Sequence, residues 1–139
     1  MERTEQPSRC VIVVDESLPP GLAANAAGVL ALTLGATAPA LAGPDFVDAD
    51  GESHPGLIPT GLPILRAASH ELSRLRERAR AARLEVIDFP AFGQETTDYE
   101  EFRSRIADTP AGDLRYLGVA VRGAKPEVRK LTGSLALLR

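Results

Sequence analysis

Two carboxylates, Asp15 and Asp88, are the groups in this sequence best placed to do acid–base chemistry. Asp15 follows the apolar run CVIVV and Asp88 lies in VIDF, so each is predicted to stand at the end of a strand. Ligands of open α/β sheets bind at the carboxyl ends of strands, where two carboxylates could share a cleft and act as acid and base. The alternative is that each accepts hydrogen bonds from the amides of a turn or a helix N-terminus.

Three further polar side chains are candidate ligand contacts. Asn25 is the lone amide in an otherwise apolar helix. A buried amide without a partner costs about 1–3 kcal/mol, so Asn25 either bonds a neighbouring loop or presents its amide to a ligand. His54, in SHPG, follows a tight turn and is either solvated or part of a site. Thr132, near the end of the chain, is a candidate contact at the rim.

Several classes of site are not supported. The two histidines lie in different settings without a cysteine beside them, so no metal site is predicted. The chain lacks G-x-G-x-x-G, a P-loop and G-x-S-x-G, and no cofactor is predicted. Cys10 is the single cysteine, which excludes an intrachain disulfide, and it is expected to be a small buried hydrophobe.

Length and charge narrow the classes of partner. The 139 residues suggest a flexible N-terminal tail over residues 1–8 and one domain over residues 9–139. The net charge of −3 disfavours nucleic acid, and so makes tRNA an unlikely partner. Residues 66–83 hold six arginines against two glutamates, which is interpreted as a solvated helix face, with phosphate contact as the alternative. The longest apolar run is shorter than the roughly 20 residues a bilayer requires, so a cytoplasmic protein without a membrane segment is expected.

Hydrophobic periodicity gives the order strand, helix, hairpin, helix, strand, helix, strand, helix. The β-branched run at residues 10–14 is typical of a strand covered on both faces. The helix that follows, ending near Gly35, is apolar all round and is expected to be buried on more than one side. Asp50-Gly51 predicts a hairpin with strands near residues 46–49 and 53–58. Residues 59–67 are expected to be an irregular connection. This order predicts a three-layer α/β/α sandwich with a mixed β-sheet.

Helices and strands in the second half follow the same rules. A helix is predicted over residues 69–83, where apolar side chains recur at helical spacing, and LEVIDFP reads as a strand. Thr97 and Glu100 form a capping-box signature for the next helix. LRYLGVAVRG is predicted to be a second buried strand, KPEVRKLTG a short helix, and SLALLR a tail that packs back onto the body.

Four segments together resemble a known family: CVIVVDESLPPGLAANAAGVLAL, DADGESHPG, LEVIDF and LRYLGVAVRGAKPEVRKLTGSLALLR. They resemble an uncharacterised bacterial family with the type II peptidyl-tRNA hydrolase-like fold, over about residues 9–139. HPG and KLTGSLALLR are the most specific pieces. True type II peptidyl-tRNA hydrolases are similar in two places, where LAAN resembles their I-A-A-Q and LTGSLALL resembles their V-T-G-x-L-K-L-L.

The resemblance implies a site as well as a sandwich fold. The early helix of the true hydrolases supplies a lysine, a glutamine and a histidine, and here Gly21, Asn25 and Gly28 stand in those places. Asp88 looks like the hydrolase aspartate that follows a strand, and Thr96 or Thr97 is a loose counterpart of its threonine. Loss of the lysine removes the group that would stabilise a tRNA phosphate or a developing oxyanion.

Three hypotheses follow. The first is a diverged domain that holds a small polar ligand at the strand ends, with Asp15 and Asp88 as ionisable groups and Asn25, His54 and Thr132 as contacts. The second is residual hydrolysis of peptidyl-tRNA or a related ester, with Asp88 orienting water. The third is a homodimeric interaction module that associates through alanine-rich or apolar surfaces and has no catalytic site. The first two require Asp15, Asn25 and Asp88 to converge.

Overall fold

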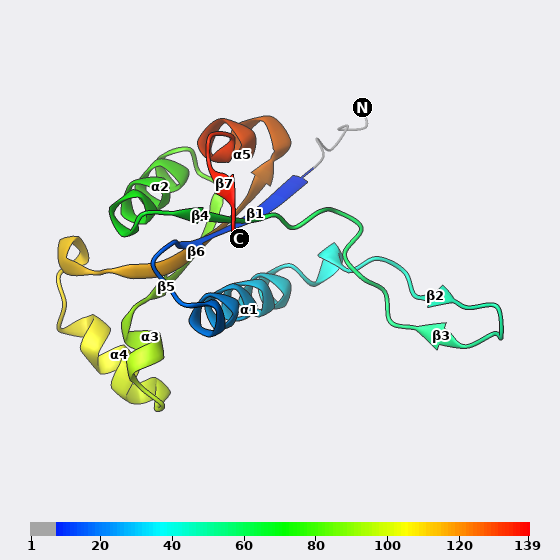
Figure 1. Cartoon of the computed structure of the whole chain (residues 1–139), viewed down its shortest axis with the longest axis horizontal. Coiled ribbons are helices and arrows are strands. Elements are labelled where there is room, and N and C mark those ends of the chain that lie inside the picture. The colour runs from blue at the N-terminus through cyan, green and yellow to red at the C-terminus, as the bar shows by residue number, and fades with distance from the viewer. Residues whose placement is uncertain (1–7) are drawn as a thin grey trace.

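A mixed five-stranded sheet with helices on both faces forms the body of the molecule, and a two-stranded arm projects from it (Figure 1). The computed structural model describes residues 8–139. The elements are β1 (Ser8–Asp15), α1 (Pro20–Thr37), η1 (Pro39–Leu41), β2 (Phe46–Val47), β3 (Ser53–His54), β4 (Ile64–Ala67), α2 (Ser69–Ala81), β5 (Glu85–Pro90), α3 (Phe92–Glu95), α4 (Tyr99–Ala107), η2 (Ala111–Asp113), β6 (Tyr116–Ala124), α5 (Lys125–Thr132) and β7 (Ala136–Leu137). The predicted α/β class and mixed sheet are confirmed.

Strand β1 occupies the middle of the sheet, whose order is β5-β6-β1-β4-β7. It pairs in parallel with β4 and antiparallel with β6, which makes the sheet mixed. Residues 11–14 of β1 are fully buried. The continuous β-branched run therefore forms a strand covered on both faces, as predicted.

Alternating residues of β1 face two different helical layers. Ile12 and Val14 pack into a cluster with Leu30 of α1. Val11 and Val13 pack into a second cluster with side chains of α2 and α5, including Leu72 and Val128. Because successive side chains of a strand point to opposite faces, β1 connects both halves of the core.

Helix α1 is buried along one face only. Ala23, Ala26, Leu30 and Leu34 are buried, whereas Leu32 is 78% exposed. The expectation that this helix is buried on more than one side is therefore wrong for the single chain. By length and composition α1 could also cross a membrane, a property that core helices of soluble proteins share.

Two short strands were not predicted. Residues 59–67, expected to be irregular, contain β4, and the C-terminal tail contributes β7 at the edge of β4. The tail predicted over residues 1–8 lies outside the described residues except for Ser8, which pairs with Ala124 in the sheet. Helix α4 is capped by Asp98 rather than Thr97, because Asp98 Oδ1 accepts a 2.9 Å hydrogen bond from the Glu100 amide.

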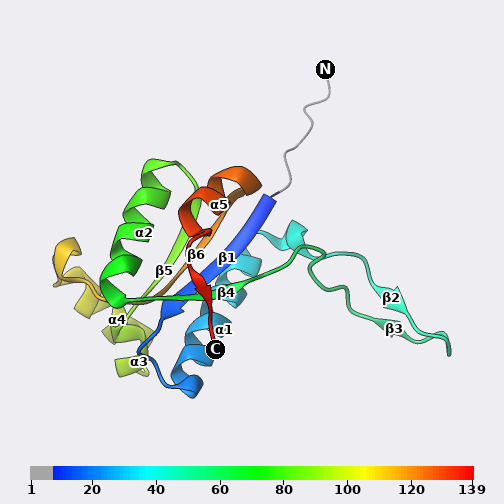
Figure 2. The same cartoon turned by 45° about the horizontal axis from the view of Figure 1, so that its top comes forward.

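The arm, defined here as residues 44–58, is the predicted hairpin. Its turn is at Asp50-Gly51, as expected, with Gly51 at φ +84°. The ladder is shorter than predicted, with two residues in each strand. Figures 1 and 2 show the arm extending away from the sheet and its helices.

Gly118 of β6 allows α1 to lie close to the sheet. A Cβ at this position would lie 2.8 Å from Leu30 Cδ1 and 3.1 Å from the Val13 carbonyl oxygen. We expect Gly118→Ala to lower the free energy of unfolding by about 1–3 kcal/mol in urea denaturation, because the core would be overpacked. The control is Gly21→Ala, whose methyl group meets nothing within 4 Å and should leave stability unchanged or slightly raised. Equal stability of the two variants would contradict the close packing of α1.

Candidate functional site

Asp15 is a fully bonded carboxylate at the end of β1. It is 1% exposed; Oδ1 accepts hydrogen bonds from the Ser17 amide (2.9 Å) and hydroxyl (2.7 Å), and Oδ2 accepts one from Arg115 (3.0 Å). Burial by itself would raise the pKa of Asp15, but the bonds from Ser17 and Arg115 outweigh it and hold the pKa below its usual value. The arrangement matches the alternative interpretation, in which Asp15 holds a turn.

Asp88 is paired with an arginine of the neighbouring layer. Arg76 of α2 donates from Nε to Asp88 Oδ2 at 2.8 Å, and its guanidinium lies 5.4 Å from the centre of the Tyr116 ring. Burial would lower the pKa of Arg76, but the hydrogen bond and charge of Asp88 raise it overall. The ion pair ties β5 to α2, so the carboxylate already has a cationic partner.

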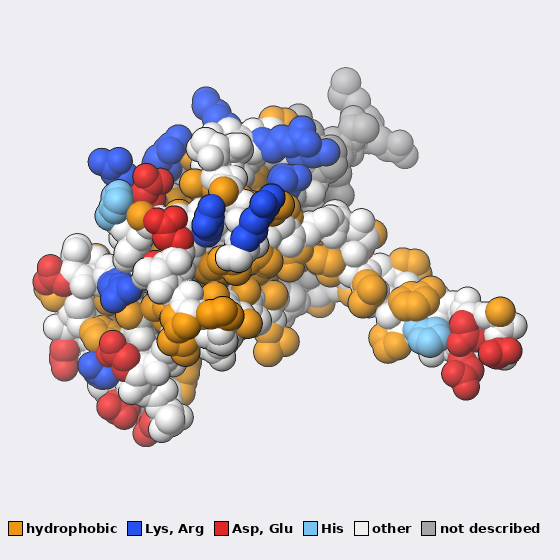
Figure 3. All heavy atoms as spheres, in the orientation of Figure 1, with side chains coloured by type: hydrophobic (Ala, Val, Ile, Leu, Met, Phe, Trp, Pro, Cys, Tyr) orange, Lys and Arg blue, Asp and Glu red, His pale blue; other side chains and the backbone are white. Residues whose placement is uncertain are grey.

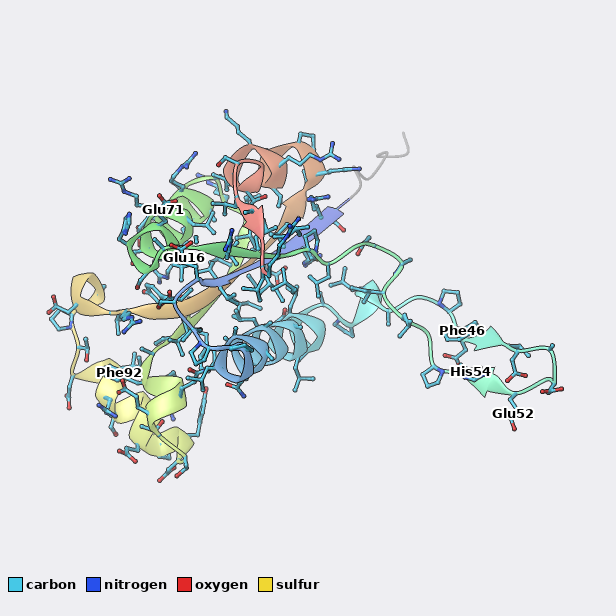
Figure 4. The ribbon with its side chains drawn as sticks, in the orientation of Figure 1. Glu16, Phe46, Glu52, His54, Glu71 and Phe92 are labelled. Carbon is cyan, nitrogen blue, oxygen red and sulfur yellow. The ribbon has the colours of Figure 1, made fainter. Side chains whose placement is uncertain are left out.

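The other three candidates lie in separate environments. Asn25 is exposed on α1, where its Oδ1 accepts a 3.2 Å hydrogen bond from Gln94 of α3. His54 lies on the arm, stacked on Phe46 and 2.9 Å from Asp48 Oδ2 (Figure 4). Thr132 is buried within α5 and donates to the Val128 carbonyl at 2.8 Å.

The five predicted site residues therefore do not converge. Asp15 follows Val11 and Val13 in the alternation of β1, and Asp88 bonds α2, so both carboxylates face the layer of α2 and α5. Asn25 belongs to α1 on the opposite face, and His54 stands away from the body. The expectation that Asp15, Asn25 and Asp88 line one cleft is not met. A position at the end of a strand defines the edge of the sheet at which a residue lies, but not the face of the sheet toward which its side chain points.

A cavity of about 400 Å³ lies elsewhere, between α1, β5 and the segment that forms α3 and α4. β5 is an edge strand, and this segment lies beside it. The apolar lining consists of Val29, Leu30, Ile87, Phe89, Pro90, Gly93, Tyr99 and Phe102, and the polar lining of Thr33, Asp88, Thr96, Thr97 and Asp98. Among the predicted residues, Asp88 borders this cavity, together with both threonines that the family resemblance singled out.

Hydrogen-bond acceptors dominate the polar part of the lining. Thr33 donates its hydroxyl hydrogen to the Val29 carbonyl (2.8 Å) and Thr96 to the Phe92 carbonyl (2.9 Å), so both hydroxyls are left to accept. Asp98 adds a carboxylate, whereas the carboxylate of Asp88 faces α2 and bonds Arg76. A bound molecule would therefore meet a mainly apolar wall and a rim that favours a donor.

Sequence reasoning missed most of this cavity. Tyr99 and Phe102 belong to the helix that the capping-box signature at Thr97 and Glu100 predicts, and the sequence assigns them no role in a site. Both do lie on α4, but they line the cavity, with ring centroids 5.8 Å apart. The available signal was the cluster of threonine and aspartate between Phe92 and Phe102, immediately after a strand.

Asp15→Asn should lower the free energy of unfolding by about 1–3 kcal/mol near neutral pH, because a buried charge-assisted network is broken. Since the folded-state pKa of Asp15 is lowered, its contribution is present above the unfolded pKa and is lost as pH falls through the folded value. The stabilities of the two proteins in urea titrations should therefore begin to converge as the pH falls below about 4, the unfolded pKa. The exposed Asp113→Asn serves as control, and a pH-independent difference would contradict the ionic role of Asp15.

Comparison with known proteins agrees with the geometry at the level of the fold. A solved protein of unknown function from Agrobacterium tumefaciens strain C58 is similar, with 15% sequence identity and a TM-score of 0.84, covering 94% of this chain and 96% of that one. No curated protein matches the chain. Residues 8–139 match the sequence profile of a family described as protein of unknown function, DUF2000. Because that match spans nearly the whole chain, the protein belongs to the DUF2000 family.

Proposed function

We propose that this protein binds a small, mainly apolar molecule with a hydrogen-bond-donating end, in the cavity between α1, β5 and the α3–α4 segment. The observation that carries this proposal is the combination of about 400 Å³ of space, an apolar wall and a rim of acceptors. Small-molecule sites are typically of roughly 300–1,000 Å³, with few polar groups fixing orientation.

The walls favour an amphiphilic ligand over the small polar one expected from the sequence. Val29 and Leu30 lie on one side, Phe89 comes from the sheet, and Tyr99 and Phe102 come from α4. These side chains can bury a chain or ring of several carbon atoms, each methylene contributing about 0.8 kcal/mol.

Charge at the rim disfavours anionic ligands. Asp98 places a carboxylate at the cavity, and two nearby arginines are already paired with carboxylates. Arg76 pairs with Asp88, while Arg105 pairs with Glu95 at 3.2 Å and lies over the Phe92 ring. A phosphate or carboxylate would meet carboxylate repulsion, whereas an amine or hydroxyl would find acceptors.

A head-group series tests this proposal. Octylamine, octanol and octanoate share one chain, and we expect thermal-shift stabilisation by the amine and the alcohol but not by the acid. Val29→Phe fills the cavity and should abolish the shift. Ala81→Phe, which introduces the same side chain at an exposed position of α2, should leave it unchanged. Equal thermal shifts for all three head groups, or a shift that is retained in Val29→Phe, would show that the compounds bind outside this cavity.

A second candidate function is hydrolysis of a small ester or aminoacyl bond. The observation in its favour is that Asp88 and Thr97 border one cavity, in agreement with the resemblance to type II peptidyl-tRNA hydrolases. Two features limit it: Gly21 and Gly28 provide no lysine or histidine, and the arginine-rich α2 covers the opposite face of the sheet from α1. A small substrate is therefore favoured over tRNA.

Asp88→Asn distinguishes hydrolysis from binding alone. If Asp88 orients water, the variant should lose roughly 100-fold in the rate of cleaving an N-acetylaminoacyl ester, the scale of general-base catalysis. Asp48→Asn, on the arm, is the matched control and should retain the rate. Equal rates for Asp88→Asn and the unchanged protein would remove the hydrolase hypothesis and leave the binding proposal intact.

A further inference from the structure

The arm carries large apolar side chains that are left in water. Phe46 is 49% exposed, Val47 65%, Leu57 72% and Ile58 39%. Figure 2 shows the arm reaching away from the sheet and its helices. Large apolar side chains gathered on a projecting element typically mark a contact with another molecule.

Hydrogen bonds and close backbone contacts order the arm internally. The Gly56 amide donates to Asp45 Oδ1 and the Gly43 amide donates to the Leu57 carbonyl, both at 2.9 Å. A Cβ at Gly56 would lie 2.0 Å from the Gly43 carbonyl oxygen, so only glycine allows this approach. An isolated two-stranded hairpin is at best marginally stable in water, so this order requires an external support.

The second uncovered surface is α1 and the sheet beside it. α1 lies over β1, β5 and β6, while Leu62, Ile64 and Leu138, at the β4–β7 end of the same face, are only partly buried. An apolar groove of about 120 Å³ separates α1 from the base of the arm, with Ala31 and Leu62 among its walls. We call these surfaces together the α1 flank.

The net charge of the arm differs in sign from that of the rest of the chain. Asp45, Asp48, Asp50 and Glu52 give residues 44–58 a charge of −4 with no lysine or arginine, so the remaining residues sum to +1. Figure 3 shows the acidic groups at the outer part of the arm and blue groups over α2 and α5. Arg66 is exposed on β4, and by alternation with Leu65 it lies on the α1 side. Arg66 thus offers the acidic turn of another copy a cationic contact at the edge of the α1 flank.

We propose that two copies of this chain form a two-fold dimer in which each arm lies along the α1 flank of the other. The apolar side chains of the arm cover the exposed face of α1 around Leu32, and the acidic turn reaches Arg66. Residues 45–50 span about 20 Å at roughly 3.3 Å per residue, and α1 is about 27 Å long, so one arm can follow most of the partner's helix.

The size of the contact agrees with that of a stable interface. The fifteen residues of the arm, together with the exposed side chains of α1 around Leu32 and the partly buried Leu62, Ile64 and Leu138, approach the twenty to thirty residues that each partner typically contributes. Exchange of identical arms is also isologous, so the contact closes as a dimer and leaves no free arm to extend a chain. The dimer gives α1 the second buried side that its apolar circumference predicts.

Mass in solution tests the proposal across a wide range of protein concentration. We expect twice the chain mass of 14.8 kDa, and a roughly 30-fold or greater increase in the dimer dissociation constant for Leu32→Glu and for Val47→Glu. Tyr99→Glu is the matched control, since Tyr99 is 72% exposed but lies on α4, and it should remain dimeric. Circular dichroism should show that all three variants are folded.

Cross-linking identifies the exchanged arm. Val47→Cys mixed with Leu32→Cys should give a disulfide-linked dimer under mild oxidation, while Leu32→Cys alone should not; Cys10 is 1% exposed and stays unreactive. A single chain mass at every concentration, or a dimer that survives both glutamates, would overturn the proposal. Monomers that co-sediment with phosphatidylcholine vesicles would also overturn the proposal, because the exposed face of α1 would then bind lipid and not a second copy.

Discussion

Burial of both faces of β1 is the constraint on which this structure depends. Residues 11–14 are fully buried, and their alternation requires one apolar layer on each side of the sheet. α1 supplies one layer and α2 with α5 supply the other. Gly118 lets α1 approach, and Asp15 ends the strand with a charge that Ser17 and Arg115 satisfy. The polar groups at this end of β1 are consequently bonded to one another and stabilise the end of the core. The cavity lies at a different place, beside the edge strand β5.

Elements with a strong local pattern could be predicted from the sequence. The buried strand, the Asp50-Gly51 turn and the amphipathic α2 are each specified by neighbouring residues. β4 was missed because it has four residues, follows Pro63, and is defined by parallel pairing with β1, more than fifty positions earlier in the chain. The burial of α1 was overestimated because composition reports how apolar a helix is, and not how many of its sides one chain can cover.

The candidate site was predictable only in part, for a geometric reason. A strand end can be read from sequence, so Asp15 and Asp88 were found at the ends of strands. The face that each side chain takes, and its ion pair, depend on tertiary register. The cavity is space left between α1, β5 and a segment that follows β5, and Tyr99 and Phe102 acquire their role there only through that packing. Asp88, Thr96 and Thr97 could be singled out from the sequence because a resemblance to a family relates residues to positions in a fold. Single residue types do not give that information.

The α3–α4 segment, which forms one wall of the cavity, makes few buried contacts with the core. Neither α3 nor α4 has a fully buried residue, and Gln94 links α3 to α1 through one side-chain amide that meets Asn25 and the Leu22 carbonyl. Substitutions in such a segment can be made without disturbing the buried sheet. The shape and polarity of the cavity can therefore change through substitutions in α3 and α4 while the buried scaffold stays the same.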